Sequence, residues 1–318
     1  MKRILAILLC LLMLIPAATA EKEASAPLLE LHQLAIGYAD SYYIRCGETE
    51  ILIDAGNPNP GSVTDDIVNY LRAAGAGKLD AMIITHWHLD HCEKMNAVLA
   101  EFGDENTVVY GPSEQLPDSA VGEKADREHT KVVIQLTPLA NGSYRQMKFN
   151  DVVHIGDLTI TCTGPETINQ NGVHNKDSLN FLIQYGERRL FFTGDYGHSN
   201  QINKYFSEFL KDVDVLKFPH HGGAYTDKDG NQVFDIGVYA LRVLRPTYVL
   251  VPTMNNNWMV YNYVWKSRVI EKSRVVWGVQ RDNVMTERDG HVVIVTDGGA
   301  FIEARKQQNP ADYAPRAN

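Results

Sequence analysis

Three histidines and an aspartate lie within six residues of one another, directly after an apolar run. The stretch 82–95, MIITHWHLDHCEKM, contains His86, His88, Asp90 and His91. Side chains two residues apart in an extended segment point to the same side, so we expect His86 and His88 to lie together. The chain must then turn, which brings Asp90 and His91 to a second point nearby. These imidazole and carboxylate groups are ligands that suit two borderline metal ions.

The elements that would position this cluster alternate between strand and helix. Apolar residues predict strands over 28–46, 49–56 and 79–85, and helical spacing predicts helices over 63–75 and 92–103. Later strands are expected at 106–111, 152–164, 178–186, 188–195, 213–223, 246–253 and, as the closing strand, 291–298, and later helices at 201–212, 237–245 and 261–273. No repeat or linker divides this pattern, which indicates one α/β domain with mixed sheets and helices outside.

The N-terminal residues have the composition of a secretory signal. Lys2 and Arg3 precede an apolar run over 4–15, and the small residues Ala18-Thr19-Ala20 follow. The run is shorter than the roughly 20 residues of a membrane-spanning helix, so we expect cleavage after Ala20, secretion and no permanent membrane anchor. The sequence then predicts a polar tether over 21–27, one folded domain over 28–305 and a polar C-terminal tail over 306–318.

The chain is acidic and contains few cysteines. Its formal net charge is −9, and this becomes −11 without residues 1–20, which contain two basic residues and no acidic ones. A surface of this sign repels a phosphate backbone, so we expect no tight binding of duplex nucleic acid. Outside residues 1–20 the cysteines are Cys46, Cys92 and Cys162, an odd number that does not describe a disulfide scaffold. The sequence leaves open whether two of them form a bridge.

Four segments, in order, resemble the motifs of the metallo-β-lactamase superfamily. They are THWHLDH at 85–91, LIDAG with Asp54, LFFTGD ending at Asp195, and LKFPHHGG with His220 and His221. The resemblance covers about residues 28–305 and implies an α/β fold, an αββα sandwich of two mixed β-sheets flanked by helices. It also implies two divalent metal ions, zinc or alternatively manganese, held by His86, His88, Asp90, His91, Asp195 and His220.

The resemblance assigns roles within this set. Asp195 would be shared by both ions together with a bridging hydroxide that attacks the substrate, and Asp90 would orient this nucleophile. One histidine of the pair 220–221 would be a ligand, and the other would stabilise or protonate the leaving oxygen. The sequence does not decide between them; we favour His220 as the ligand and His221 as the catalytic group. Asp54 would orient a ligand histidine rather than bind metal.

Further segments narrow the resemblance to the hydrolase domain of the ComEC competence proteins and to secreted phosphorylcholine esterases. They are GYADSYYI at 37–44, NKDSLNFLI at 175–183, VDVLKFPHHG at 213–222 and MTERDGHVVIVTDG at 285–298. Both groups cleave phosphoesters, so the resemblance implies an exported phosphodiesterase or nuclease-like hydrolase that acts on a phosphoester substrate.

Two alternatives to this function remain open. The loop NGVHNKDSL stands where lactamases and lactonases have a GHTxG loop, which leaves His174 and Asn175 as candidate metal or substrate contacts. The first alternative is a lactamase or lactonase that acts on a cyclic carbonyl compound, which the absence of the GHTxG loop disfavours. The second is a metal-binding module without catalysis, which the six intact candidate ligands disfavour. Neither the physiological substrate nor the oligomeric state is predicted.

Overall fold

The computed structural model describes residues 26–57, 66–117, 119–121, 131–133, 144–168, 172–196, 210–226, 228–230, 232–253 and 258–307. The predicted signal peptide over 1–20 lies outside these residues, as do 21–25 of the tether, 308–318 of the tail and most of the helix predicted over 201–212. None of the helices in the described part of the chain has the length and apolar character needed to cross a bilayer.

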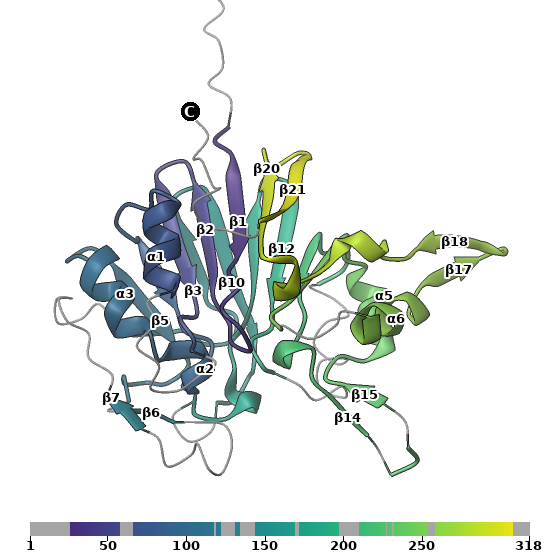
Figure 1. The fold of residues 1–318 in the computed structure, drawn as a ribbon, viewed down its shortest axis with the longest axis horizontal. Coiled ribbons are helices and arrows are strands. Elements are labelled where there is room, and N and C mark those ends of the chain that lie inside the picture. Colours follow the sequence, from purple (N-terminus) through teal and green to yellow (C-terminus); the bar gives the residue numbers. More distant parts are fainter. Residues whose placement is uncertain are drawn as a thin grey trace, which may run out of the picture.

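A mixed sheet of eight strands forms one half of the fold, in the order β21-β20-β1-β2-β3-β4-β5-β8 (Figure 1). Its strands are β1 (Leu29–Gln33), β2 (Tyr42–Cys46), β3 (Thr49–Ile53), β4 (Ala81–Ile83), β5 (Val108–Gly111), β8 (Tyr144–Gln146), β20 (His291–Thr296) and β21 (Phe301–Gln307). Neighbouring strands from β21 to β3 are antiparallel, whereas β3, β4, β5 and β8 are parallel. The parallel strands therefore carry their C-terminal ends to one edge of the sheet.

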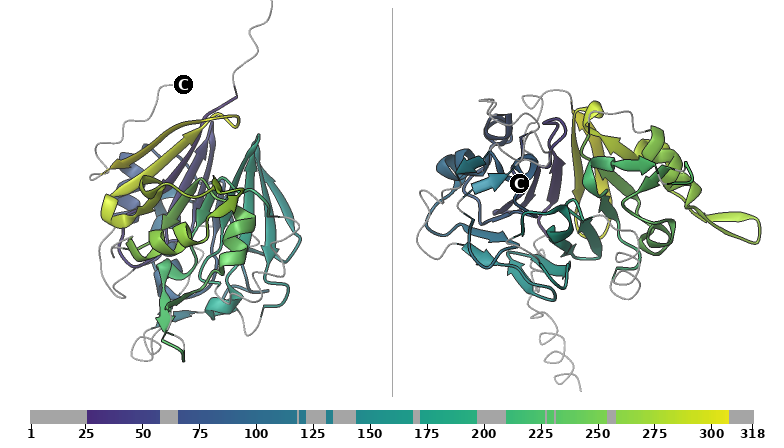
Figure 2. Two further views of the ribbon diagram at one scale, coloured as in Figure 1. Left: turned by 90° about the vertical axis from the view of Figure 1, so that its right-hand side faces the viewer. Right: turned by 90° about the horizontal axis from the view of Figure 1, so that it is seen from below.

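A second mixed sheet of seven strands faces the first, in the order β19-β16-β13-β12-β11-β10-β9 (Figure 2). Its strands are β9 (Val152–Ile155), β10 (Leu158–Gly164), β11 (Asn180–Tyr185), β12 (Arg188–Phe192), β13 (Val215–Lys217), β16 (Tyr248–Val251) and β19 (Val284–Thr286). Here β12, β13, β16 and β19 are parallel. The loops after β12 and β13 begin at the ends of neighbouring parallel strands, which brings residues far apart in the chain together.

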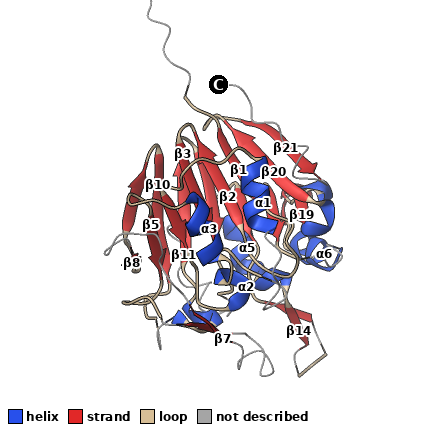
Figure 3. Ribbon diagram, turned by 60° about the vertical axis from the view of Figure 1, so that its left-hand side comes forward, coloured by secondary structure: helices blue, strands red, loops and turns tan. Residues whose placement is uncertain are grey.

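Helices cover the outer face of each sheet (Figure 3). The α-helices are α1 (Asp66–Ala73), α2 (Leu89–Cys92), α3 (Met95–Phe102), α5 (Val238–Leu244) and α6 (Trp258–Lys266). Single 3-10 turns are η2 (Asn175–Asp177), η3 (His220–Gly222), η4 (Arg281–Asn283) and η5 (Glu287–Asp289). Two-stranded ribbons are formed by β6 (Ser119–Val121) with β7 (Lys131–Val133), β14 (Ala224–Thr226) with β15 (Gln232–Phe234), and β17 (Val269–Glu271) with β18 (Arg274–Trp277).

Strand periodicity explains why the four layers stay together. Along β3, Ile51 and Ile53 belong to the core between the two sheets, whereas Leu52 belongs to the core beneath α1 and α3. A third apolar cluster packs α5 and α6 on the second sheet, with Leu241 and Val264 fully buried in it. Strands that are buried on both faces in this way have continuous apolar sequences. The predicted αββα sandwich is confirmed.

The structure corrects two predicted elements near the C-terminus. The helix expected over 261–273 ends at Lys266, because the β-branched and aromatic residues that follow pair as β17 and β18. The strand over 291–298 does not close the sheet, because β21 pairs with it and extends to Gln307. Earlier, the helix expected over 92–103 is present as α3 over Met95–Phe102, and it is preceded by a further short helix, α2, which starts within the histidine motif at Leu89.

Candidate metal centre

The end of β4 places the first pair of histidines. After Ile83 the chain stays extended, so the Trp87 side chain is buried in the core beneath α1 and α3, and its indole nitrogen donates to Ser113 Oγ at 2.9 Å. The flanking residues point the other way, with 3.0 Å between His86 Nε2 and His88 Nδ1. Both side chains are buried. The spacing therefore brings these two imidazoles together, as expected for an extended segment.

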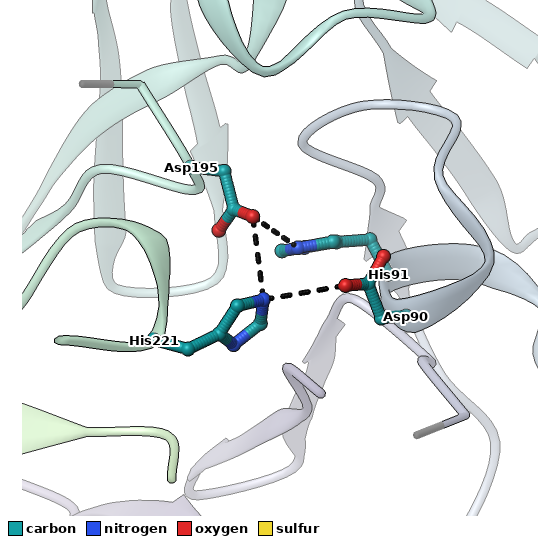
Figure 4. Close-up of side chains that lie close together, drawn as sticks. All are labelled: Asp90, His91, Asp195 and His221. Carbon is teal, nitrogen blue, oxygen red and sulfur yellow. Dashed lines mark ion pairs between the residues drawn. The ribbon is translucent and has the colours of Figure 1, made fainter. Parts of the chain in front are cut away.

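A second group gathers where the two sheets approach each other. Helix α2 presents Asp90 and His91, the loop after β12 presents Asp195, and the loop after β13 presents His221 (Figure 4). Asp195 Oδ2 lies 3.2 Å from His91 Nε2 and 3.2 Å from His221 Nε2, and the latter nitrogen lies 3.5 Å from Asp90 Oδ2. One ligand atom from each of the four residues lies within 4.8 Å of the others.

The donor atoms of this group fit a divalent metal ion. All four residues are buried, yet His91 Nε2, Asp195 Oδ2, His221 Nε2 and Asp90 Oδ1 have no hydrogen-bond partner within the described residues. Buried polar atoms without a partner are rare in folded proteins and require an explanation. Two imidazole nitrogens and two carboxylates are a ligand set typical of zinc and similar ions. The chemistry of the donors therefore agrees with metal binding.

Asp54 forms a hydrogen bond with His91 on the side of the ring away from the other candidate ligands. Its Oδ2 accepts a hydrogen bond from His91 Nδ1 at 2.8 Å and another from Thr85 Oγ1 at 2.8 Å, and its Oδ1 accepts one from the Thr85 amide at 2.7 Å. This arrangement fixes the tautomer and leaves Nε2 directed at Asp195. Asp54 has a φ of 56°, in the left-handed region where aspartate is tolerated. The orienting role predicted for Asp54 matches this contact but stays a prediction.

Two buried residues of the centre were not anticipated from the sequence. Asp40 places Oδ1 3.2 Å from His221 Nδ1, and its Oδ2 lies 2.5 Å from Lys217 Nζ. Lys217 also donates to the Gly194 carbonyl at 2.6 Å and lies 3.5 Å from Asp195 Oδ1. Asp40 thus faces Nδ1 of His221 as Asp54 faces Nδ1 of His91. Two sequence features could have revealed these residues: a lysine in the apolar strand β13 and an aspartate in the GYAD turn.

The NKDSL loop contributes a serine rather than a histidine. Ser178 Oγ lies 3.1 Å from His86 Nδ1 and accepts a hydrogen bond from the Asp195 amide at 3.1 Å. The loops meet so closely that a Cβ on Gly194 would lie 2.9 Å from side-chain atoms of both Ser178 and Thr85, which requires glycine there. His174, by contrast, is exposed and does not belong to either group of candidate ligands in the described residues.

The structure brings His221, not His220, to the other candidate ligands. Both residues have left-handed backbone conformations, with φ of 50° and 52°, and this tight turn directs only the second imidazole inward. His220 Nε2 remains 4.0 Å from Asp195 Oδ2 and accepts a hydrogen bond from Asn175 Nδ2 at 3.2 Å. Its Nδ1 donates to Asp235 Oδ2 at 2.7 Å. Sequence spacing could not reveal which histidine turns inward, so the preference for His220 as ligand is replaced by His221.

Electrostatics keeps the centre highly charged. Burial raises the pKa of Asp195, but the neighbouring His221, His91 and Lys217 outweigh burial and hold this pKa well below its usual value. Burial lowers the pKa of Lys217, but Asp40 and Asp195 outweigh burial and raise it. Burial, together with the neighbouring His91 and His88, lowers the pKa of His86 well below its ordinary value. Burial lowers the pKa of His91 and of His221, but Asp195 and the other nearby carboxylates outweigh burial and raise both pKa values well above the ordinary value. Because metal binds neutral imidazoles and ionised carboxylates, His91 and His221 would release protons when a metal binds.

Comparison with known proteins places this fold and centre in a family. A family model described as a β-lactamase superfamily domain matches residues 49–250, more than half of the chain. The chain belongs to the metallo-β-lactamase superfamily. The resemblance deduced from the motifs is therefore confirmed, and the superfamily's fold indicates a metal-dependent hydrolase in general terms.

Three proteins illustrate the range of the similarity. ComE operon protein 3 of Bacillus subtilis is 26% identical over 211 residues, 61% of this chain but 25% of that protein. This supports the ComEC-like resemblance, although the chain spans only about a quarter of its relative's length. The metallo-β-lactamase fold protein YhfI from Bacillus subtilis has a TM-score of 0.45 and 17% identity, and the match covers 70% of this chain and 85% of YhfI. The metallo-β-lactamase SMB-1 has a TM-score of 0.41 and 15% identity, and the match covers 63% of this chain and 83% of SMB-1.

The cysteines take no part in the centre. Cys46, Cys92 and Cys162 are all free and buried. Cys92 follows His91, but its Sγ donates to the His88 carbonyl at 3.1 Å and packs in the core beneath α1 and α3. Burial raises the pKa of the Cys92 thiol well above its ordinary value, which disfavours the thiolate that a metal would need.

Proposed function

We propose that this superfamily member is an exported hydrolase of phosphoesters, phosphodiesterase or nuclease-like, that uses two divalent metal ions, zinc in the first instance. The observation that carries the proposal is the position of Asp195. Its Oδ2 meets Nε2 of both His91 and His221, and its backbone amide is held by the serine that also contacts His86. The carboxylate thereby contacts both imidazoles of the second set of candidate ligands, and its backbone lies one serine away from the first set, which supports a shared role for Asp195.

The residues divide into two sets of ligands. His86 and His88 would hold one ion, and Asp90, His91 and His221 the other, with Asp195 shared between them. Ions bound there would supply Lewis-acid polarisation of a phosphoryl oxygen and an acidified water as nucleophile. Asp90 Oδ1 has no hydrogen-bond partner within the described residues, so it is available to accept a proton and orient that water.

The polar residues beside the metal centre favour a charged leaving group. His220 is partly exposed, and its Nδ1 donates to Asp235. In a ring protonated at both nitrogens, which this carboxylate would stabilise, Nε2 would donate instead of accepting from Asn175. Asn175 adds an amide next to the same nitrogen. Together they would donate hydrogen bonds to the leaving oxygen of a phosphoester, the role first expected of His221.

The alternative of a lactamase or lactonase receives less support. That reading expects a third histidine from the loop before Asp195, and His174 is the histidine in that loop. Its side chain is exposed, whereas Ser178 contacts His86 instead. A non-catalytic module would have lost ligands, yet the charged centre is complete and held by Asp40, Asp54 and Lys217.

Three assays on the purified chain test this proposal. We expect hydrolysis of bis-p-nitrophenyl phosphate, no hydrolysis of nitrocefin or of a lactone, and loss of the phosphodiesterase activity on adding a chelator. Elemental analysis is expected to find two metal ions per chain, and the D195N variant to lose both metal and activity. Hydrolysis of nitrocefin without the phosphodiester would support the lactamase alternative. The absence of both metal and activity would support the non-catalytic module.

The predicted localisation and partners belong to the same proposal. Export after cleavage near Ala20 is tested by N-terminal sequencing of the protein from a culture supernatant. The net charge of −9 argues against tight binding of duplex nucleic acid, so short phosphodiesters are the preferred substrates.

A further inference from the structure

A ribbon that the proposed chemistry does not use projects from the fold. Strands β17 and β18 follow α6 and form a two-stranded hairpin that extends beyond the helices of the second sheet (Figure 1). Its tip is a two-residue turn, Lys272-Ser273, with φ of 46° and 66°. Turns of this geometry favour Asn and Gly, so a lysine here is kept at some conformational cost. The hairpin therefore presents a charge at its outermost point.

The same hairpin exposes aliphatic side chains. Ile270 and Val275 are cross-strand partners on one face, and they are 53% and 52% exposed. Val276, the next residue of β18, is 48% exposed and lies where the pairing of the two strands shifts by one residue. These are three of the seven large hydrophobic residues that are exposed in the described part of the chain. Apolar side chains gathered in one place on a surface indicate a site of interaction.

Basic residues surround these aliphatic side chains. Residues 266–282 contain five basic and two acidic side chains, a net charge of +3, whereas the whole chain has a net charge of −9. Lys272 and Arg274 lie on the hairpin and are exposed, and Arg268 at its base stacks on Trp265 at 5.1 Å. The positive charge is thus local, and this part of an acidic molecule is complementary to a negative surface.

We propose that the β17–β18 hairpin docks this protein on the surface of an anionic lipid bilayer. Ile270, Val275 and Val276 would enter the boundary between headgroups and acyl chains, and the basic residues would contact the negative headgroups. A lipid surface binds both kinds of side chain, because the free energies of aliphatic burial and of electrostatic attraction add. A nucleic acid or another soluble polyanion would interact only with the basic side chains, which makes it the less suitable partner.

Vesicle flotation tests the proposal. The purified chain, with one verified N-terminus shared by all variants, is mixed with phosphatidylcholine vesicles that contain or lack phosphatidylglycerol. We expect binding only to the anionic vesicles. K272E/R274E and, separately, I270S/V275S/V276S are each expected to weaken binding roughly tenfold or more, since each basic residue near an anionic surface contributes a several-fold increase in binding. The control R145E/K148E makes the same charge change at exposed positions elsewhere and is expected to bind like the parent.

Other results would overturn the proposal. Equal binding to neutral vesicles, no binding at all, or an equal loss in the control would each do so, because none requires this hairpin to recognise anionic lipid. Binding to DNA or another soluble polyanion that survives I270S/V275S/V276S, without vesicle binding, would assign the hairpin to a different partner. Thermal unfolding and hydrolysis of a soluble substrate by each variant show that the fold is intact, since the hairpin lies outside the metal centre.

Discussion

Lys217 Nζ lies 2.5 Å from Asp40 Oδ2, and both side chains are almost completely buried. This ion pair sits behind the candidate metal ligands, where Asp40 also contacts His221 and Lys217 also approaches Asp195. One buried cation thus compensates two carboxylates that the metal centre needs in ionised form. The pair connects β13 with the loop that precedes β2, so it also joins the two sheets.

Removing the cation should destabilise the fold. In K217M, Asp40 loses its lysine partner and keeps only its histidine contacts, and removing one partner of a buried ion pair typically costs about 3–5 kcal/mol of unfolding free energy. The double variant K217M/D40N is expected to recover part of this loss. Urea unfolding of metal-free protein measures both, with exposed K148M as the matched control, expected to change stability by less than about 0.5 kcal/mol. A K217M variant as stable as the control would show that the pair does not support the fold.

Removing the charge of Asp54, which accepts a hydrogen bond from His91, should weaken metal binding more than it weakens folding. D54N leaves a side chain of the same shape but without the charge that orients the imidazole, so we expect metal affinity to fall about 10–100-fold. Competition with a chromophoric chelator measures this affinity. The contrasting variant D235N alters the acceptor on His220 and is expected to retain metal while lowering kcat. Equal metal affinity in D54N and the parent would contradict the orienting role.

Substitution of His220 and of His221 should have different effects on metal content. H221A removes a candidate ligand and is expected to contain less metal per chain, whereas H220A is expected to keep its metal and to lose activity in kcat. Elemental analysis of both variants, purified side by side, gives the comparison. If H220A lost metal and H221A retained it, the ligand would be the residue favoured from the sequence.

Acid should destabilise the fold through His291. Burial, with His32 nearby, lowers the pKa of His291 to about 4 from its ordinary 6.5, and its Nδ1 accepts a hydrogen bond from the Ala35 amide. The neutral ring is required, so its contribution is complete above pH 6.5 and is lost as the pH falls towards 4. The loss amounts to roughly 3 kcal/mol for a shift of this size.

The variant H291N isolates this contribution. Its amide oxygen replaces Nδ1 as acceptor and does not titrate, so we expect the difference in stability between parent and variant to shrink from pH 7 to pH 4. Urea unfolding at several pH values gives the difference, in which the other titrating groups cancel. A difference that stays constant with pH would contradict the assignment.

The sequence predicted the features that depend on local periodicity. It did not predict side-chain orientations, which depend on packing. Spacing placed His86 beside His88, and apolar strands ending in Asp195 and the histidine pair marked the other half of the centre. The inward turn of His221 could not be read, because it depends on consecutive left-handed residues after β13. Lys217 and Asp40 were missed because each is meaningful only beside the other, and they belong to segments far apart in the chain.

The place of β1 between β2 and β20 has a consequence for how the chain folds. Strand β1 pairs along one edge with β2, the next strand in the chain. Its other edge pairs with β20, far along the chain, with Leu31 opposite Ile294. The first sheet therefore cannot close until the residues of β20 have emerged. Contacts of such long sequence separation slow folding and leave an edge of β1 unprotected meanwhile. Loss of the last hairpin, β20–β21, should for this reason produce aggregation rather than a smaller folded protein.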